Sequence, residues 1–254
     1  MAPTTTADLG RIRRRQPPAA WIRYANSSTR PVPVSRLLLS DFEGSAPWRK
    51  LRSRHGQQHL SGSYWAATTG GHVVYESRLE LARLLLADFD PDVTAIYAQP
   101  LRLVAVVDGR RRAHVPDLLL ASASGVVRVV NVKPADRLAK PKIAEALAWP
   151  GALVERHGWR YEIWSGCDPV MLDNVRFLAA YRRPGIVAGA AVEQAWAAVR
   201  DGEQLAVAEH RLAMARGQPS HTVRPALLAL LWSGRLVTDL TRPLSGASTL
   251  RRST

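Results

Sequence analysis

The chain has 254 residues, of which 46% are hydrophobic and 22% charged, enough for one substantial core and a smaller second module. Lys and Arg number 35 against 21 Asp and Glu, and the net charge of +14 favours polyanionic partners such as nucleic acid. The alternative is a basic but otherwise ordinary protein with heavy arginine usage. The single cysteine, Cys167, excludes an internal disulfide framework and a multi-cysteine metal site. No apolar run approaches the length of a membrane span and no secretory signal is evident, so we expect a cytoplasmic protein without a membrane partner.

The N-terminal quarter carries most of the excess positive charge. Residues 1–58 contain eleven Lys or Arg and three acids, a net charge of +8, with Pro17, Pro18, Pro31 and Pro33 interspersed. This composition predicts a basic, partly extended arm over residues 1–60 that lies along a phosphate backbone; a solvated tail is the alternative.

The middle of the chain, residues 61–184, predicts an α/β core with a mixed central sheet. Apolar residues at helical spacing indicate a helix from Ser77 to Phe89, ended by Pro91. Three β-rich runs over 95–107, 111–121 and 126–134 follow, joined by turn residues, and predict an antiparallel meander. Residues 140–158 predict a helix that breaks near Pro150, and residues 160–164 predict a further strand. We interpret the aspartates of "DFDPD", residues 88–92, as a solvated helix end rather than a calcium loop.

Residues 185–254 predict a separate helical domain. Two helices over 190–199 and 203–215 and a third before Gly234 precede a short hairpin with Pro243 and Gly246 at its tip. Helices followed by a small hairpin with basic flanks suggest a winged helix, which binds either DNA or protein.

Polar residues interrupt the two apolar runs of "VPDLLLASASGVVRVVNVKP". A turn centred near Ser124 places Asp117 across from about residues 128–130, and strand alternation places Asn131 and Lys133 on one face. An acid, an amide oxygen and a lysine on one sheet face fit a phosphodiesterase that uses Mg²⁺ or Mn²⁺. Asp117, the Asn131 amide oxygen and the Val132 carbonyl would bind the metal, and Lys133 would orient water and offset charge.

The helix adds a candidate fourth acid. Glu80 is a candidate metal ligand, but Ser77 and Glu80 also form the pattern of a capping box, and Glu76 is an alternative acid one turn earlier. His114 precedes the same motif, where it either contacts phosphate or fills space in the core.

The ordered set of Glu80 in "SRLELARLLLADFDPDV", "QPL" at 99–101, "VPDLLL" with Asp117 and "VNVKPA" with Lys133 resembles the endonuclease subunit of heteromeric transposases, the TnsA type. This family belongs to the PD-(D/E)xK nucleases, and the resemblance spans roughly residues 65–165. It implies a restriction-endonuclease-like core, a winged-helix C-terminal domain, Glu80 and Asp117 as metal ligands and Lys133 as the catalytic lysine. Asn131 stands where most of the superfamily has Glu or Asp, although TnsA-type subunits carry a neutral Gln there.

The resemblance implies Mg²⁺-dependent cleavage of double-stranded DNA at transposon ends, beside a separate DDE-type transposase subunit. Two alternatives stay open. One is a noncatalytic DNA-binding or assembly factor with a degenerate site, and the other is a stand-alone restriction or repair nuclease.

Overall fold

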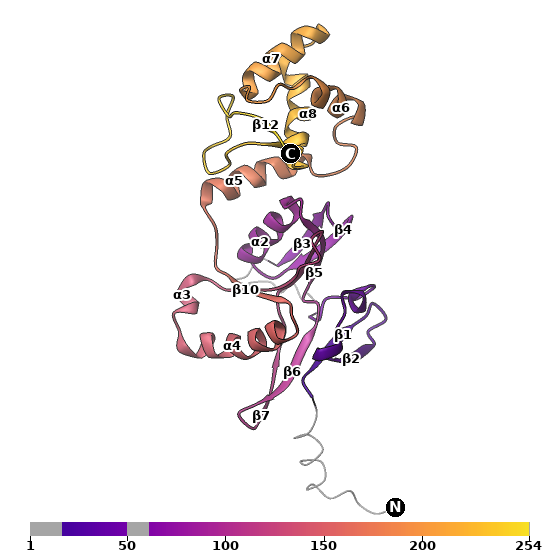
Figure 1. Cartoon of the computed structure of the whole chain (residues 1–254), viewed down its shortest axis with the longest axis vertical. Coiled ribbons are helices and arrows are strands. Elements are labelled where there is room, and N and C mark those ends of the chain that lie inside the picture. The colour runs from indigo at the N-terminus through magenta and orange to yellow at the C-terminus, as the bar shows by residue number, and fades with distance from the viewer. Residues whose placement is uncertain (1–16, 50–60, 254) are drawn as a thin grey trace, which may run out of the picture. The chain divides into compact units, whose positions relative to one another are not determined.

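The structure is a computed structural model that describes residues 17–49 and 61–253 (Figure 1). These residues divide into two compact units whose segments alternate along the chain. The first unit contains the described residues up to 63 with 73–80 and 95–165, and the second contains 64–72, 81–94 and 166 onward. The described residues form seven α-helices and four β-sheets, one of them mixed, which confirms the predicted α/β class.

An antiparallel sheet of four strands, in the order β2-β1-β6-β7, belongs to the first unit. Its strands are β1 (Ala19–Arg23), β2 (Thr29–Pro33), β6 (Arg102–Val107) and β7 (Arg110–His114). Asp108 and Gly109 join β6 to β7 with φ of +50° and +73°. Positive φ at both positions is what the tight turns of two-residue hairpins require, so this predicted turn is confirmed.

The mixed sheet has the order β10-β9-β8-β5. Strand β9 (Val127–Val132) pairs antiparallel with β8 (Leu118–Ser122) and parallel with β10 (Arg160–Trp164), and β5 (Val93–Ala98) forms the other edge. The parallel pair needs a crossover, which α3 (Ala135–Leu138) and α4 (Pro141–Arg156) provide.

The predicted single meander is wrong, because two of its three runs each divide at a proline. Pro100 lies between β5 and β6, and Pro116 lies between β7 and β8, so each run contributes to both four-stranded sheets. Proline has no backbone N–H to continue a ladder, and the chain changes sheet where the ladder stops.

The predicted helix break near Pro150 is also wrong, because α4 continues through this residue. Pro150 and Gly151 are both buried. A Cβ at position 151 would lie 2.8 Å from Cδ1 of Tyr161, so only glycine lets the Tyr161 ring approach the helix so closely. Packing against β10 therefore maintains a helix that local propensity alone would break.

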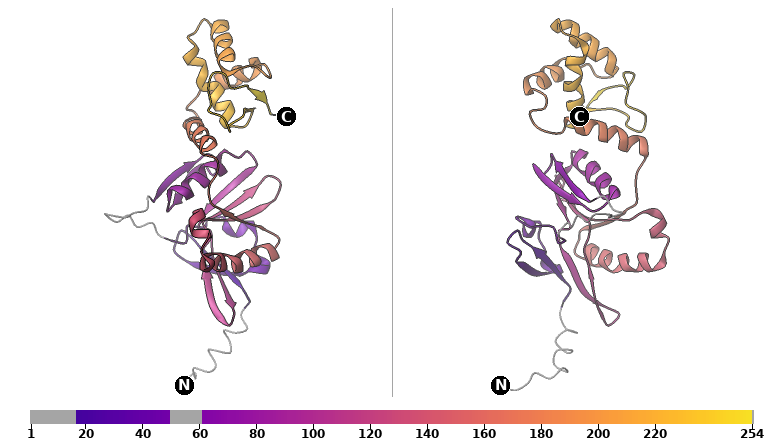
Figure 2. Two further views of the ribbon diagram at one scale, coloured as in Figure 1. Left: turned by 90° about the vertical axis from the view of Figure 1, so that its left-hand side faces the viewer. Right: turned by 180° about the vertical axis from the view of Figure 1, so that it is seen from behind.

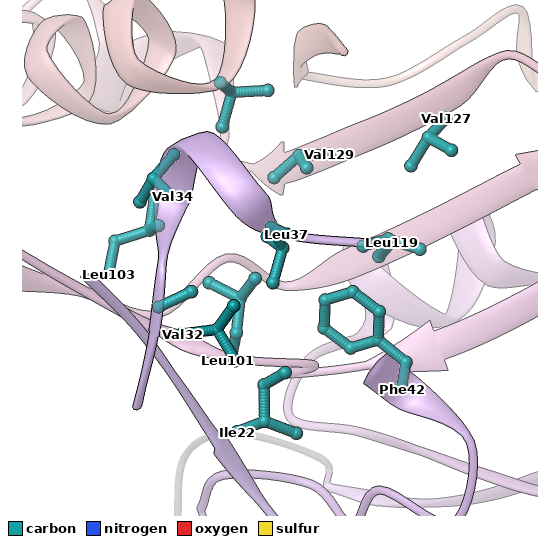
Figure 3. Packing of buried hydrophobic residues seen from close by; sticks show 12 residues of the cluster. Ile22, Val32, Val34, Leu37, Phe42, Leu101, Leu103, Leu119, Val127 and Val129 are labelled. Carbon is teal, nitrogen blue, oxygen red and sulfur yellow. The ribbon is translucent and has the colours of Figure 1, made fainter. Parts of the chain in front are cut away.

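The predicted N-terminal arm is wrong over residues 17–49, which are folded. Ala20, Ile22 and Phe42 are fully buried, and they lie in a hydrophobic cluster with Leu119 and Val129 of the mixed sheet (Figure 3). The 3₁₀ helices η1 (Val34–Arg36) and η2 (Leu39–Phe42) complete this part. The rest of the predicted arm, residues 1–16 and 50–60, lies outside the described residues.

The second unit combines the C-terminal helices with part of the middle of the chain. Its elements are α5 (Pro169–Leu178), η3 (Ala179–Tyr181), α6 (Gly189–Ala198), α7 (Leu205–Arg216), α8 (Ser220–Trp232), β11 (Leu236–Val237) and β12 (Arg251–Arg252), seen in orange and yellow in Figure 2. The hairpin of β3 (Gly62–Ala66) and β4 (Gly71–Tyr75) and helix α2 (Arg78–Phe89) contribute residues to both units. The three predicted C-terminal helices and the short antiparallel hairpin are confirmed as elements.

The predicted boundary between residues 184 and 185 does not coincide with the division into units, since α5 belongs with the C-terminal segment. Asn174 of α5 is buried and fixes the loop between β11 and β12. Its Nδ2 donates to the carbonyls of Leu240 and Arg242 at 2.9 and 2.7 Å, and its Oδ1 accepts from the Leu244 N–H at 3.0 Å. The interpretation of "DFDPD" as a solvated helix end also fails at Asp88.

Asp88 is buried and serves as a structural cap. Its carboxylate accepts hydrogen bonds from the Tyr64 hydroxyl, the backbone N–H groups of Ala67 and Thr68, and the Thr68 hydroxyl, at 2.8 to 3.0 Å. Asp90 and Asp92 are exposed. The first aspartate therefore orders the β3–β4 turn, and burial is tolerated because the carboxylate is fully hydrogen-bonded.

Candidate active site

Asp117 lies just before β8, one residue beyond the last pair of the β8–β9 ladder, Leu118 opposite Val130. Its side chain is 5% exposed, and Oδ2 accepts a hydrogen bond from the Val132 N–H at 2.7 Å. The Asp117 N–H donates to the Val130 carbonyl at 3.0 Å. The acid is thus fixed against the end of β9, slightly further along that strand than predicted.

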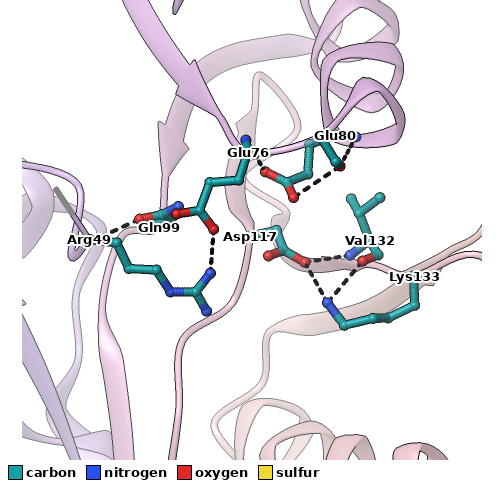
Figure 4. Close-up of polar contacts among 8 residues, drawn as sticks. Arg49, Glu76, Glu80, Gln99, Asp117, Val132 and Lys133 are labelled. Carbon is teal, nitrogen blue, oxygen red and sulfur yellow. Dashed lines mark hydrogen bonds and ion pairs between the residues drawn. The ribbon is translucent and has the colours of Figure 1, made fainter. Parts of the chain in front are cut away.

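Lys133 follows β9 directly and points back toward Asp117 (Figure 4). Its Nζ lies 3.6 Å from Asp117 Oδ2 and donates to the Val132 carbonyl oxygen at 3.0 Å. The lysine side chain is 35% exposed, so solvent still reaches it. The Lys133 ammonium therefore already contacts two of the oxygens that we predicted from the sequence as metal ligands.

Glu80 forms half of the predicted capping box, because its carboxylate accepts from the backbone N–H of Glu76 and not from that of Ser77. Oε2 accepts from the Glu76 N–H at 2.7 Å, Oε1 accepts from the Ser77 hydroxyl at 3.1 Å, and the Glu80 N–H donates to Ser77 Oγ at 3.1 Å. Burial raises the pKa of Glu80, and the nearby charge of Asp117 raises it further. The two acids are close enough to repel each other, which is the electrostatic setting that a bound cation relieves.

Glu76, the alternative acid, has a different partner. Its Oε2 lies 2.5 Å from Nη1 of Arg49. Arg49 is held in turn by Gln99, whose side-chain oxygen accepts from the Arg49 N–H at 3.0 Å. In Figure 4, Asp117 lies in the middle. Arg49, Gln99 and Glu76 lie on one side of it, and Lys133 lies on the other side.

Asn131 is fully buried, and its amide oxygen is engaged by a histidine. Its Oδ1 lies 2.6 Å from Nε2 of His114, so Nε2 carries the proton in this pairing. Burial lowers the pKa of His114, which favours the neutral ring. Burial raises the pKa of the neighbouring Tyr161, the charge of Asp117 raises it further, and the Asn131 amide lowers it.

The structure therefore brings Glu80, Asp117 and Lys133 together, while the Asn131 oxygen faces His114. Among the residues described, no group of three or more His, Cys, Asp or Glu side chains is placed to hold a metal ion. The oxygen donors that remain near Asp117 are the Glu80 carboxylate and the Val132 carbonyl. Oxygens of this hard type are those that Mg²⁺ or Mn²⁺ prefers, and Asp117 is the one of them that a backbone N–H holds in place.

In the sequence, Arg49 is one of several positive charges of the predicted N-terminal arm, and no local pattern distinguishes it from its basic neighbours. Its partner Glu76 lies 27 residues further along the chain, so only the folded structure brings the two together. The left-handed conformation of Gln99, which places that contact, has no sequence signal other than the proline that follows it.

No helix in the described parts of the chain combines the length and apolar character that crossing a bilayer demands.

The chain was also compared with known proteins. No protein-family model matches it, and no curated protein is similar to it in sequence.

Proposed function

We propose that this protein is the DNA endonuclease subunit of a heteromeric transposase of the TnsA type. One observation carries the proposal. The Lys133 ammonium lies within 3.6 Å of Asp117 Oδ2 and 3.0 Å of the Val132 oxygen, near a second, partly buried carboxylate at Glu80. An acid just before one strand, with a carbonyl and a lysine at the end of the neighbouring strand, are groups that a metal-dependent phosphodiesterase needs.

In this proposal Asp117, Glu80 and the Val132 carbonyl hold the metal, which when bound neutralises phosphate charge and activates water. The Val132 N–H fixes the Asp117 carboxylate, so this ligand needs little rearrangement. Lys133 turns from Asp117 toward the phosphate, where its ammonium orients the attacking water and stabilises negative charge. Asn131 orders the site through His114, because its amide oxygen is already bonded to that ring.

The second unit supports DNA or partner binding in this proposal. Helices α6, α7 and α8 precede the β11–β12 hairpin, and an isolated bridge joins Gln204 to Thr249. This order is that of a winged helix, and we assign the loop between β11 and β12 as its wing. The net charge of +14 favours DNA as the substrate.

The test is cleavage of transposon-end DNA in Mg²⁺ or Mn²⁺ with the transposase subunit present. We expect the wild type to cut and Lys133→Ala to lose at least about a hundredfold in rate, the scale for a group that stabilises charge in the transition state. Lys140→Ala is the matched control. Lys140 is exposed at the start of α4, and its substitution removes the same charge as Lys133→Ala. Equal cleavage by wild type and Lys133→Ala would reject the assigned site.

A noncatalytic DNA-binding factor is the second candidate. Its specific support is the amide at Asn131, whose oxygen is bonded to His114, together with the absence of a three-ligand cluster among the described residues. DNA binding by the wild type without any cleavage, in either metal and with the partner present, would favour this function.

A further inference from the structure

Arg49 is held at the edge of the candidate active site by a set of backbone contacts. The Trp48 N–H donates to the Gln99 carbonyl and the Arg49 N–H donates to the Gln99 side chain, both at 3.0 Å. Arg23 of β1 donates to the Trp48 carbonyl at 3.2 Å. The backbone at Arg49 is therefore anchored to a strand and to the residue between β5 and β6.

Gln99 is the centre of these contacts and has an unfavourable conformation. It is 2% exposed, adopts φ of +45°, and its Nε2 is buried without a partner among the described residues. Its backbone N–H donates to the Asp117 carbonyl at 2.8 Å. Strain and an unpaired buried amide persist mainly where a site requires them. Here a single residue links the backbone of Asp117 to that of Arg49.

The Arg49 side chain points toward the carboxylates but remains accessible. It is 46% exposed and pairs with Glu76, whose N–H donates to Glu80. Within the described part of the chain, Glu76 is the acid that pairs with this guanidinium, and it does so through Nη1.

We propose that Arg49 binds a phosphate of the DNA backbone next to the one that is cut, with Glu76 as its partner in the absence of DNA. This inference rests on the proposed nuclease function. A guanidinium presents a planar set of donors that matches phosphate oxygens in pairs, and its position is set before DNA arrives. Glu76 thereby has an electrostatic function distinct from the metal ligand role of Glu80.

The test measures binding of the full chain to a short mixed-sequence duplex in EDTA over a range of salt concentrations. Loss of one phosphate contact lowers the slope of log K against log[salt] by about 0.9, and we expect this change for Arg49→Ala. Arg30→Ala is the matched control, because Arg30 forms an ion pair of the same length with Asp41 and is 51% exposed. We expect its slope to equal that of the wild type.

A second measurement uses duplexes in which single phosphates are replaced by neutral methylphosphonates. One position should weaken binding by the wild type but not by Arg49→Ala, whereas Arg30→Ala should resemble the wild type. Glu76→Gln should bind at least as tightly as the wild type, since it frees Arg49. Equal slopes for Arg49→Ala and Arg30→Ala, with no phosphate position that depends on Arg49, would overturn the inference.

The two proposals fail in different ways. If Lys133→Ala abolishes cleavage and Arg49→Ala leaves the salt slope unchanged, Arg49 does not bind a DNA phosphate, and the proposed nuclease site is still supported. If Arg49→Ala lowers the slope but the wild type never cleaves, the phosphate contact stands and the nuclease function fails.

Discussion

Glu80 shows how one side chain can satisfy two demands. It caps the start of α2 by accepting from the Ser77 hydroxyl and the Glu76 N–H, and it also lies near Asp117. The cap uses the hydrogen-bonding capacity of the carboxylate, whereas metal binding uses its charge. Because Gln also closes a capping box, the two functions can be separated by substitution.

We predict that Glu80→Gln retains the stability of the wild type but loses metal-dependent cleavage. Ser77→Ala should show the reverse, with a loss of about 1 kcal/mol in the free energy of unfolding and little change in cleavage. Urea unfolding at neutral pH and cleavage assays on the same preparations measure both effects. A large loss of stability in Glu80→Gln, with normal cleavage, would make Glu80 a purely structural residue.

The sequence predicted the residues of the site better than their partners. Asp117 and Lys133 interrupt apolar runs, and the Ser77 to Glu80 spacing is visible directly, so local patterns identified all of them. The contacts of Asn131 with His114 and of Glu76 with Arg49 were not predictable in this way. They depend on how two sheets and a 3₁₀-containing segment fold together, which no local pattern records.

At the scale of elements, tertiary packing explains which prolines end an element and where a helix requires glycine. The prolines at 100 and 116 divide predicted runs between sheets, whereas Pro150 leaves α4 intact. Local rules anticipated the helix Ser77–Phe89 and the strand 160–164 to within a residue. They failed where a tertiary contact, such as the Tyr161 ring on α4, outweighed propensity.

We predict that Gly151→Ala destabilises the protein by about 1–3 kcal/mol, because the added methyl group overlaps the Tyr161 ring. Gly189→Ala is the matched control at the start of α6, since a Cβ there meets no atom within 4 Å. It should change stability by no more than about 0.5 kcal/mol. Thermal and urea unfolding give the comparison, and equal effects of the two substitutions would contradict the assigned packing.

At the scale of the whole molecule, the two units are not consecutive in sequence. The second unit takes residues 64–72 and 81–94 from the middle of the chain, and the Phe89 ring lies 5.3 Å from that of Trp232. The sequence suggested consecutive domains because the strand-rich pattern ends near residue 185 and a helical pattern begins. Such a pattern does not reveal that α2 supplies apolar surface to the C-terminal helices.

We predict that a fragment of residues 166–254 is unstable, because it lacks the segment that covers Trp232. Circular dichroism and limited proteolysis should show a broad, weakly cooperative transition for this fragment and a sharp one for the full chain. A fragment 166–254 that unfolds as cooperatively as the longer chain would show that the C-terminal segment folds alone.

The contacts of Lys133 with Asp117 and the Val132 carbonyl have a consequence for ion affinity. The ammonium occupies the same oxygens that the proposed function assigns to a divalent ion, so it acts as a competitor within the protein. An ion that bound there would displace the ammonium, and in the proposed mechanism the lysine would then be free to turn toward the phosphate. Loss of Lys133 would therefore tighten ion binding while it weakens catalysis, and the two properties would change in opposite directions.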